Sequence, residues 1–259
     1  MPSFTSPSPK LPGGYRLLKL ESVDSTNAEA RRRSAAGEPG PLWVWSARQS
    51  AGRGRAGREW RSEPGNLFAS LLITVACPMS VASQLALLAG LAAYDTIAKL
   101  LSEETREQLL LKWPNDVLLG GAKVAGMLLE SANGPQEHRS TVVVGTGINL
   151  ANHPEELAQP ATSLAAHGAE VTPAAALETL AATTHAWLRR WEEGASFQVI
   201  RRAWLDRAGP TGRPLRVRLH NEEAEGLFAG LDSGGALRLL MSDGAERRVA
   251  AGDVFFGSR

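Results

Sequence analysis

The 259-residue sequence predicts an α/β (α+β) protein in which a mixed β-sheet packs on helices and a small β-barrel follows. Up to about residue 206, apolar strand-like segments alternate with segments of helical periodicity. After residue 209, short apolar/polar alternating segments are separated by Gly, Asp and Asn turns, which is typical of a small antiparallel barrel. We therefore expect a flexible arm over 1–14, a main domain over 15–209 and a barrel over 210–259.

The elements of the main domain are expected in the following order. A helix begins near Thr26, which stands at capping-box spacing from Glu29, and it ends before Gly37. The expected strands cover 41–47, 65–75, three segments within 108–130 that are joined by a Pro-Asn-Asp turn and a Gly-Gly hairpin, and 140–150. The expected helices cover about 80–101 and two segments within 173–206.

The composition excludes several classes of protein. Hydrophobic residues make up 43% of the chain, enough for a full core. The formal net charge of +1 argues against an extended nucleic-acid surface, although a local basic patch stays possible. A single cysteine, Cys77, cannot form an internal disulfide and favours a reducing, cytoplasmic location. The most apolar stretch, 81–101, contains Ser, Gln, Asp and Lys, so we interpret it as a buried core helix rather than a membrane span.

The stretch "ARQSAGRGRAGREW", residues 47–60, carries glycines at the G-x-G-x-x-G spacing of a dinucleotide-binding loop. That loop must open a helix, and Pro64 and Gly65 exclude a long helix directly after it. No acidic residue follows about twenty positions on to hold a ribose hydroxyl. The arginines among the glycines are instead compatible with a pocket for a phosphate or carboxylate, with a solvated basic loop, or with a loop that contacts RNA.

A second cluster of charged residues lies in "LKWPNDVLLGGAKVAGMLLE", residues 111–130. The hairpin at Gly120-Gly121 should bring Lys123 level with Asp116, which is compatible with a reactive site or with a simple ion pair. Glycines in this segment and in "GTGIN", 145–149, leave room for a ligand or allow tight packing. The sequence has no His/Cys metal spacing, so no metal site is predicted. Any chemistry would use Arg, Lys and Asp on phosphate or carboxylate groups.

Five motifs in order resemble biotin protein ligases: Ser25-Thr26-Asn27, Gln49 before "GRGRAGREW", "KWPNDVLL", Lys123 with Gly126, and "GTGIN". The resemblance covers about residues 18–259. It implies a class II synthetase-like catalytic domain and an SH3-like C-terminal barrel. Since only about twenty residues precede the motifs, we expect the single-function type, without an N-terminal DNA-binding domain and without a repressor function.

The resemblance also implies two half-reactions. Biotin and Mg-ATP give biotinyl-5′-AMP, and biotin is then transferred to one lysine of a carboxyl carrier domain, that of acetyl-CoA carboxylase being expected. No tightly bound prosthetic group, DNA partner or membrane partner is expected, and a monomer and a homodimer both stay open.

The same resemblance assigns residues to these steps. Lys123, Arg53 and Asp116 are the implied catalytic residues, with Lys123 bridging the biotin carboxylate and the α-phosphate and Arg53 closing the loop over the adenylate. Asp116 would position the magnesium nucleotide or receive a proton from the incoming lysine. The implied biotin contacts are Ser25, Thr26, Asn27, Gln49, Arg53, Gly54, Arg55 and Lys123. The implied nucleotide contacts are Arg53, Arg55, Arg58, Trp60, Lys112, Asn115, Asp116, Lys123, Gly145 and Asn149.

Three alternatives remain. A lipoate or octanoate ligase or transferase shares the catalytic architecture, but the short polar side chains favour a ureido ligand over a bare acyl chain. A nucleic-acid-binding module would account for an arginine loop beside an SH3-like barrel. An inactive carrier-binding homologue would be expected to have lost some of the charged residues, all of which are present.

Overall fold

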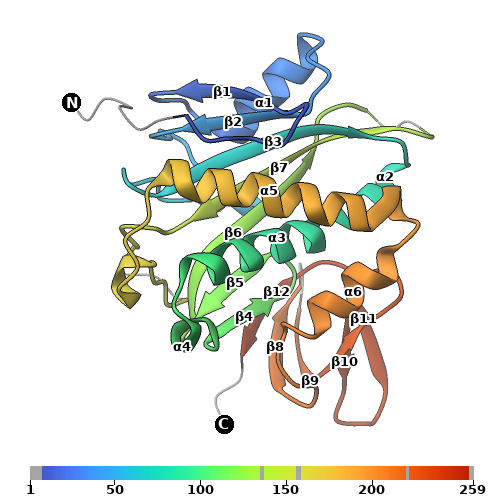
Figure 1. The fold of residues 1–259 in the computed structure, drawn as a ribbon. Helices are drawn as coiled ribbons and strands as arrows, with labels where there is room; N and C mark the ends of the chain where they lie inside the picture. Colours follow the sequence, from blue (N-terminus) through green and yellow to red (C-terminus); the bar gives the residue numbers. More distant parts are fainter. Residues whose placement is uncertain (1–7, 135–136, 156–158, 220–221, 257–259) are drawn as a thin grey trace.

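The computed structural model describes residues 8–134, 137–155, 159–219 and 222–256. A seven-stranded sheet forms the main domain (Figure 1). In spatial order its strands are β1 (Arg16–Leu20), β2 (Leu42–Ser46), β3 (Leu67–Val75), β7 (Ser140–Ile148), β6 (Ala122–Ser131), β5 (Asp116–Leu119) and β4 (Leu109–Lys112). β1 and β2 pair in parallel and the other neighbours are antiparallel, so the expected mixed sheet is confirmed.

Helices cover both faces of this sheet. On β2, Leu42 and Val44 pack with Ala30 of helix α1 (Thr26–Ala35), while Trp43 and Trp45 belong to the larger core. Alternate residues of a strand point to opposite faces, so α1 lies on one face and the larger core on the other. That core contains α3 (Leu85–Leu100) and α5 (Pro173–Trp191), which run across the sheet in Figure 1.

The helix expected over about 80–101 is divided into α2 (Met79–Ala82) and α3. At the junction the backbone makes tighter i→i+3 bonds, from Gln84 N to Val81 O at 3.0 Å and from Ala86 N to Ser83 O at 3.2 Å. Residues 79–100 are together long and apolar enough to cross a membrane, but 61% of the most apolar window is buried inside the protein. This burial supports the interpretation of the stretch as a core helix.

The remaining elements complete the chain. They are α4 (Glu103–Arg106), α6 (Phe197–Leu205), the 3₁₀ turns η1 (Arg55–Gly57), η2 (Ala165–His167) and η3 (Glu192–Gly194), and the strands β8 (Pro214–Arg218), β9 (Glu223–Leu231), β10 (Leu237–Leu240), β11 (Glu246–Val249) and β12 (Asp253–Phe256). The last five strands form one antiparallel sheet in the order β11-β10-β9-β8-β12, which fits the expected SH3-like barrel. The predicted boundary at 209–210 falls in the connection between α6 and β8.

The barrel is fixed against the main domain by specific contacts. Trp113 Nε1 donates to Gly235 O at 3.1 Å, and Arg201 of α6 donates to the carbonyl oxygens of Leu231 and Asp232. Gly235 has a φ of +90°, and a Cβ there would come within 2.8 Å of Leu87, so only glycine permits this close approach. These contacts place strand β12 beside the open edge of the large sheet (Figure 1).

The N-terminal arm is described from residue 8 onward, and residues 1–7 of the predicted arm lie outside the described part. Lys10 N donates to Glu178 Oε2 of α5 at 2.9 Å, and Leu11 packs against the main core. The described part of the arm therefore has defined contacts with α5.

Candidate functional site

One large cavity, of about 400 Å³, is lined by every residue that the sequence assigned to the site. Its walls come from the start of α1, the glycine-arginine loop, strands β5, β6 and β7, the segment after β7, and strand β12 of the barrel. All the sequence-predicted site residues line this cavity: Ser25, Thr26, Asn27, Gln49, Arg53, Gly54, Arg55, Arg58, Trp60, Lys112, Asn115, Asp116, Lys123, Gly145 and Asn149. Residues more than a hundred positions apart thus meet in one pocket.

The polar end of the cavity is built at the start of α1, where Ser25, Thr26 and Asn27 are all buried. Thr26 N and Oγ1 both donate to Gln49 Oε1, at 2.8 and 3.1 Å. Ser70 Oγ of β3 lies 2.7 Å from Thr26 Oγ1 and 2.6 Å from Asn27 Oδ1. Hydrogen bonds therefore fix the orientation of these side chains without any ligand.

The helix cap differs from the predicted one. Ser25, not Thr26, is the N-cap, and its Oγ accepts from Ala28 N. Glu29 therefore stands outside the capping-box position and binds Arg32 and Arg33 instead, at 2.8 and 2.7 Å. Gly37 follows the end of the helix with a φ of +88°, as predicted. The shift by one residue leaves the Thr26 hydroxyl free to join the polar network.

Two residues of this network were missed at the sequence level. Ser70 is a polar residue in the middle of the apolar buried run 67–73, and that exception was the available signal. Glu130 of β6 accepts from Asn27 Nδ2 at 2.7 Å and lies 3.7 Å from Arg31. Its approach to Asn27 depends on the position of α1 across the sheet, which no local pattern shows.

The cationic end is built by the β4–β5–β6 meander. Lys112 and Asp116 face each other across β4 and β5, and Lys123 enters from β6. Asp116 Oδ1 lies 2.6 Å from Lys123 Nζ, and Oδ2 lies 3.5 Å from Lys112 Nζ. The expected closeness of Lys123 and Asp116 is confirmed, and the pair is extended by a second lysine. The Lys112 side chain is 6% exposed, and this burial lowers its pKa, while Asp116 acts in the opposite direction.

The segment after β7 fixes the backbone of Lys123. Lys123 N donates to Pro160 O at 2.8 Å, and Thr162 N donates to Lys123 O at 2.9 Å. Asn149 contributes to this segment, because its Nδ2 donates to Thr162 O at 3.0 Å. Asn149 therefore lines the cavity, and its side-chain amide stabilises the segment after β7 that forms this wall. Pro154, Gln159 and Ala161 also line the cavity, and the sequence assigned none of them.

The glycine-arginine loop forms a narrow turn rather than the start of a long helix. Gly54 N donates to Arg58 O at 2.7 Å, and Trp60 N donates to Gly52 O at 2.9 Å. The helical part is the single turn η1, and strand β3 follows it. The interpretation as a nicotinamide-binding loop is therefore excluded by its context, as the sequence indicated.

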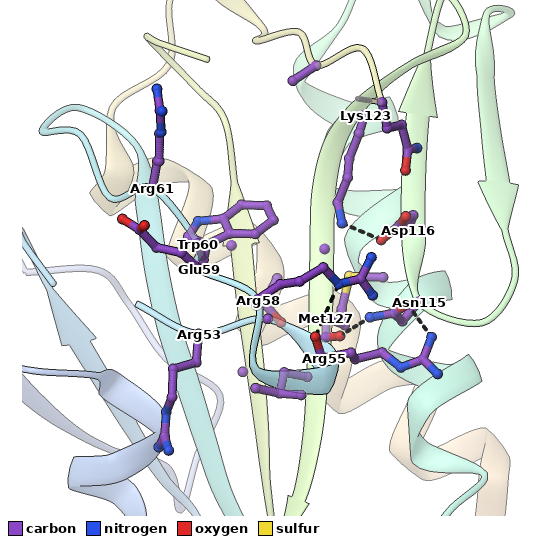
Figure 2. Close-up of a pocket in the computed structure, with 18 of the residues that line it drawn as sticks. Arg53, Arg55, Arg58, Glu59, Trp60, Arg61, Asn115, Asp116, Lys123 and Met127 are labelled. Carbon is purple, nitrogen blue, oxygen red and sulfur yellow. Dashed lines mark hydrogen bonds and ion pairs between the residues drawn. The ribbon is translucent and has the colours of Figure 1, made fainter. Parts of the chain in front are cut away.

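The arginines of the loop divide into two pairs. In Figure 2, Arg55 and Arg58 extend toward Asn115, whereas Arg53 and Arg61 extend away from it. Arg55 Nη1 donates to Asn115 Oδ1 at 3.4 Å and to Gly252 O at 3.2 Å. Burial lowers the pKa of Arg55, although it stays a cation at neutral pH. Arg53 is exposed, and its side chain has no partner among the described residues.

The glycines of β6 and β7 are explained by tight packing. A Cβ at Gly147 would lie 2.5 Å from the Trp60 ring, and one at Gly126 would lie 2.9 Å from it. The ring can therefore approach the sheet this closely only because these positions carry no side chain. Lys123 Nζ lies 5.3 Å from the centroid of the same ring, within cation–π range. Gly145 is different, since it makes room for Asn27 in the polar network.

The barrel contributes to the cavity, which the sequence analysis did not predict. Arg218, Asp253, Val254 and Phe255 line it. Asp253 Oδ1 lies 2.7 Å from Arg58 Nη2, and Lys112 Nζ lies 5.9 Å from the Phe255 ring centroid. In the sequence, the only indication of this contribution was the motif "GDVFF", which forms part of the family resemblance. Among the described residues, no group of three or more His, Cys, Asp or Glu side chains could hold a metal ion.

Comparisons with known proteins agree with this architecture. The model of the biotin/lipoate A/B protein ligase family matches residues 20–149, and that of the biotin protein ligase C-terminal domain matches residues 211–257. A biotin–[acetyl-CoA-carboxylase] ligase of Paracoccus denitrificans is 40% identical over 245 residues, which span 92% of this chain and 99% of that protein.

Two further proteins are similar to most of this chain. A bifunctional ligase/repressor of Bacillus subtilis is 30% identical over 250 residues, 94% of this chain and 75% of its own length. A biotin protein ligase from Aquifex aeolicus, solved in complex with biotin and ATP, superimposes with a TM-score of 0.74 and 25% identity, over 94% of this chain and 99% of that one.

The geometry of the ion pairs predicts a measurable stability effect. Asp116→Asn should lower the stability of the fold by about 3 kcal/mol, because it leaves the buried Lys112 ammonium without its carboxylate. The double variant Lys112→Met/Asp116→Asn should recover part of this loss, since an unpaired buried charge is no longer present. Thermal unfolding of the three proteins measures the effect. Equal unfolding temperatures for Asp116→Asn and the unmodified chain would contradict it.

Proposed function

The chain belongs to the biotin/lipoate A/B protein ligase family, and we propose that it biotinylates a carboxyl carrier domain in an ATP-dependent reaction. One observation carries this proposal: a single cavity joins a buried, pre-oriented polar end to a cationic end built from Lys112, Lys123, Arg55 and Arg58. A ureido ring suits the first end, and a carboxylate beside a nucleotide suits the second. The match of the C-terminal domain model to residues 211–257 favours biotin over lipoate.

The polar end offers both kinds of partner that a ureido ring requires. Ser25 Oγ accepts from Ala28 N, which leaves its proton for a ligand carbonyl. Asn27 Nδ2 is held by Leu128 O and Glu130, so the amide cannot rotate freely and Oδ1 faces a defined direction. A ligand N–H can donate to this oxygen. The buried setting adds specificity, because a ligand lacking these groups would leave polar atoms unpaired.

The first half-reaction joins two anions. An oxygen of the biotin carboxylate attacks the α-phosphorus of ATP, the bond from that phosphorus to the bridging oxygen breaks, and pyrophosphate leaves with the electron pair. Two like unit charges 4 Å apart repel by roughly 4 kcal/mol at an effective dielectric near 20. Lys123 is assigned to the position between the two anions, where its ammonium group offsets this repulsion. Arg58 is assigned to the departing pyrophosphate.

The second half-reaction transfers the acyl group. The neutral amine of the carrier lysine attacks the acyl carbon, the carbon–oxygen bond to AMP breaks, and the amine loses a proton. Both carboxylate oxygens of Asp116 face lysines, so its first role is to orient Lys112 and Lys123. Receipt of the proton from the incoming lysine and positioning of the nucleotide remain further assignments for Asp116.

Magnesium enters this account as part of the nucleotide substrate. Asp116 and Glu59 are carboxylates of the cavity wall, and Mg²⁺ is commonly held by one or two carboxylates together with substrate phosphates. The residues therefore fit a metal that arrives with ATP. We assign no resident metal.

The acceptor and the location remain proposals. The carrier of acetyl-CoA carboxylase is the proposed acceptor, by similarity to the Paracoccus protein. A cytoplasmic location, the absence of DNA and membrane partners, and the choice between monomer and homodimer remain predictions of the sequence.

The function is tested by the intact mass of an apo carrier domain incubated with this protein, Mg-ATP and equal amounts of biotin and lipoate. Addition of a single biotin is expected, and it should require ATP and the carrier lysine. A lipoyl adduct would reassign the polar end of the cavity. Lack of any adduct with several carriers would contradict ligase activity.

Lys123→Ala should slow the formation of biotinyl-5′-AMP by ~100-fold or more, the effect typical of losing one electrostatic contact to a transition state. Lys99→Ala, an exposed substitution on α3, is the matched control. Rapid-quench measurement of the adenylate reports the step directly. A near-normal rate for Lys123→Ala would remove Lys123 from its assigned role.

Arg53→Gly should make the enzyme release biotinyl-5′-AMP, because Arg53 is the arginine assigned to close the loop and is without a protein partner among the described residues. Released adenylate would biotinylate lysines of an added bystander protein. Arg139→Gly, another exposed arginine outside the cavity, provides the control. Confinement of the label to the carrier lysine would show that Arg53 does not close the site.

A further inference from the structure

Asp253 is the carboxylate through which the C-terminal barrel reaches the glycine-arginine loop. It is the first residue of β12 and pairs in register with Arg218 of β8. Its side chain is 29% exposed and lines the cavity, so it lies at the junction rather than on the outer surface. None of the steps assigned above uses this carboxylate.

Asp253 contacts both arginines that face the cavity. Its Oδ1 accepts from Arg58 Nη2 at 2.7 Å and lies 3.9 Å from Arg55 Nη1. The neighbouring Gly252 O accepts from Arg55 Nη1 at 3.2 Å. Arg58 Nε in turn donates to Arg55 O at 3.2 Å. Both guanidinium groups thus contact one end of β12, and that of Arg58 also contacts the backbone of Arg55.

These contacts leave part of each guanidinium free. Arg58 uses Nε and Nη2, and Arg55 uses Nη1, among the contacts of the described residues. The other nitrogen atoms can donate to a phosphate without breaking the contact with Asp253. If the phosphate instead had to displace Asp253, the Asp253 carboxylate would occupy the same N–H donors that the phosphate needs.

We propose that Asp253 is a positioning residue for the adenylation step: it holds Arg58 directly and, beside the Gly252 carbonyl, helps to hold Arg55 in the orientation that binds the triphosphate of ATP. The proposal rests on the proposed function. The side chain of Arg58 is 55% exposed and would otherwise sample many rotamers, so fixing it in advance lowers the entropic cost of binding. The barrel therefore acts in nucleotide binding through one carboxylate.

The test compares Asp253→Asn with Asp243→Asn, which changes an exposed turn carboxylate of the same barrel without an ion pair among the described residues. Formation of biotinyl-5′-AMP is measured at varied ATP and at varied biotin. Transfer from added biotinyl-5′-AMP to the carrier is measured separately. Asp253→Asn should raise the KM for ATP about threefold to tenfold, as expected for loss of a partly exposed pair that orients a binding group.

The same substitution should leave the KM for biotin and the transfer rate unchanged. Asp253→Glu should recover part of the affinity for ATP. In an Arg58→Gln background, Asp253→Asn should add little, because both residues act through one contact. An unchanged KM for ATP, a lower one, or full additivity with Arg58→Gln would each overturn the proposal.

Destabilisation of the variant and failure of the proposed function are distinguished from these results. If Asp253→Asn lowers the unfolding temperature strongly, Asp253→Glu and the Arg58→Gln pair decide the question at a temperature where all variants are folded. If the unmodified protein forms no biotinyl-5′-AMP, the proposed function fails, and that result is independent of any Asp253 variant.

Discussion

Two lysines share one buried carboxylate at the cationic end of the cavity, and the rest of the site depends on that arrangement. Lys112 and Lys123 repel each other, and Asp116 between them makes it possible to hold both beside a partly buried pocket before any ligand arrives. The β4–β5–β6 meander fixes this triad, and the segment after β7 holds the backbone of Lys123. The two ammonium groups are therefore held in place, before binding, where the two anionic substrates must meet.

Different interactions fix the side chains at the two ends of the cavity. Hydrogen bonds inside the polar end orient Thr26 and Asn27 before binding, which suits the recognition of a neutral ring. At the other end, carboxylates hold the cations: Asp116 holds two lysines and Asp253 holds Arg58. The Trp60 ring packs closely on the glycines of β6 and β7 and lies beside Lys123. Among the described residues the Arg53 side chain makes no such contact, which suits a group that moves when the site fills.

The sequence predicted those parts of the site that depend on local geometry. Ser25, Thr26 and Asn27 are consecutive, and one hairpin joins Asp116 to Lys123, so spacing alone brings these groups together. Glu130 and Asp253 could not be predicted, because they reach Asn27 and Arg58 through the stacking of α1 on the sheet and the docking of the barrel. The break between α2 and α3 depends on i→i+3 bonds that composition does not reveal. The predicted N-cap of α1 was wrong by one residue, because Ser25 and Thr26 are both good N-cap residues.

We infer that the cavity itself joins biotin to the α-phosphate, with no carrier present. Isotope exchange between ATP and labelled pyrophosphate tests this most directly, because exchange requires reversible formation of an adenylate. We predict exchange that needs biotin, continues without any carrier domain and is not supported by lipoate. Exchange without biotin, or no exchange while biotin and Mg-ATP are both saturating, would contradict the account.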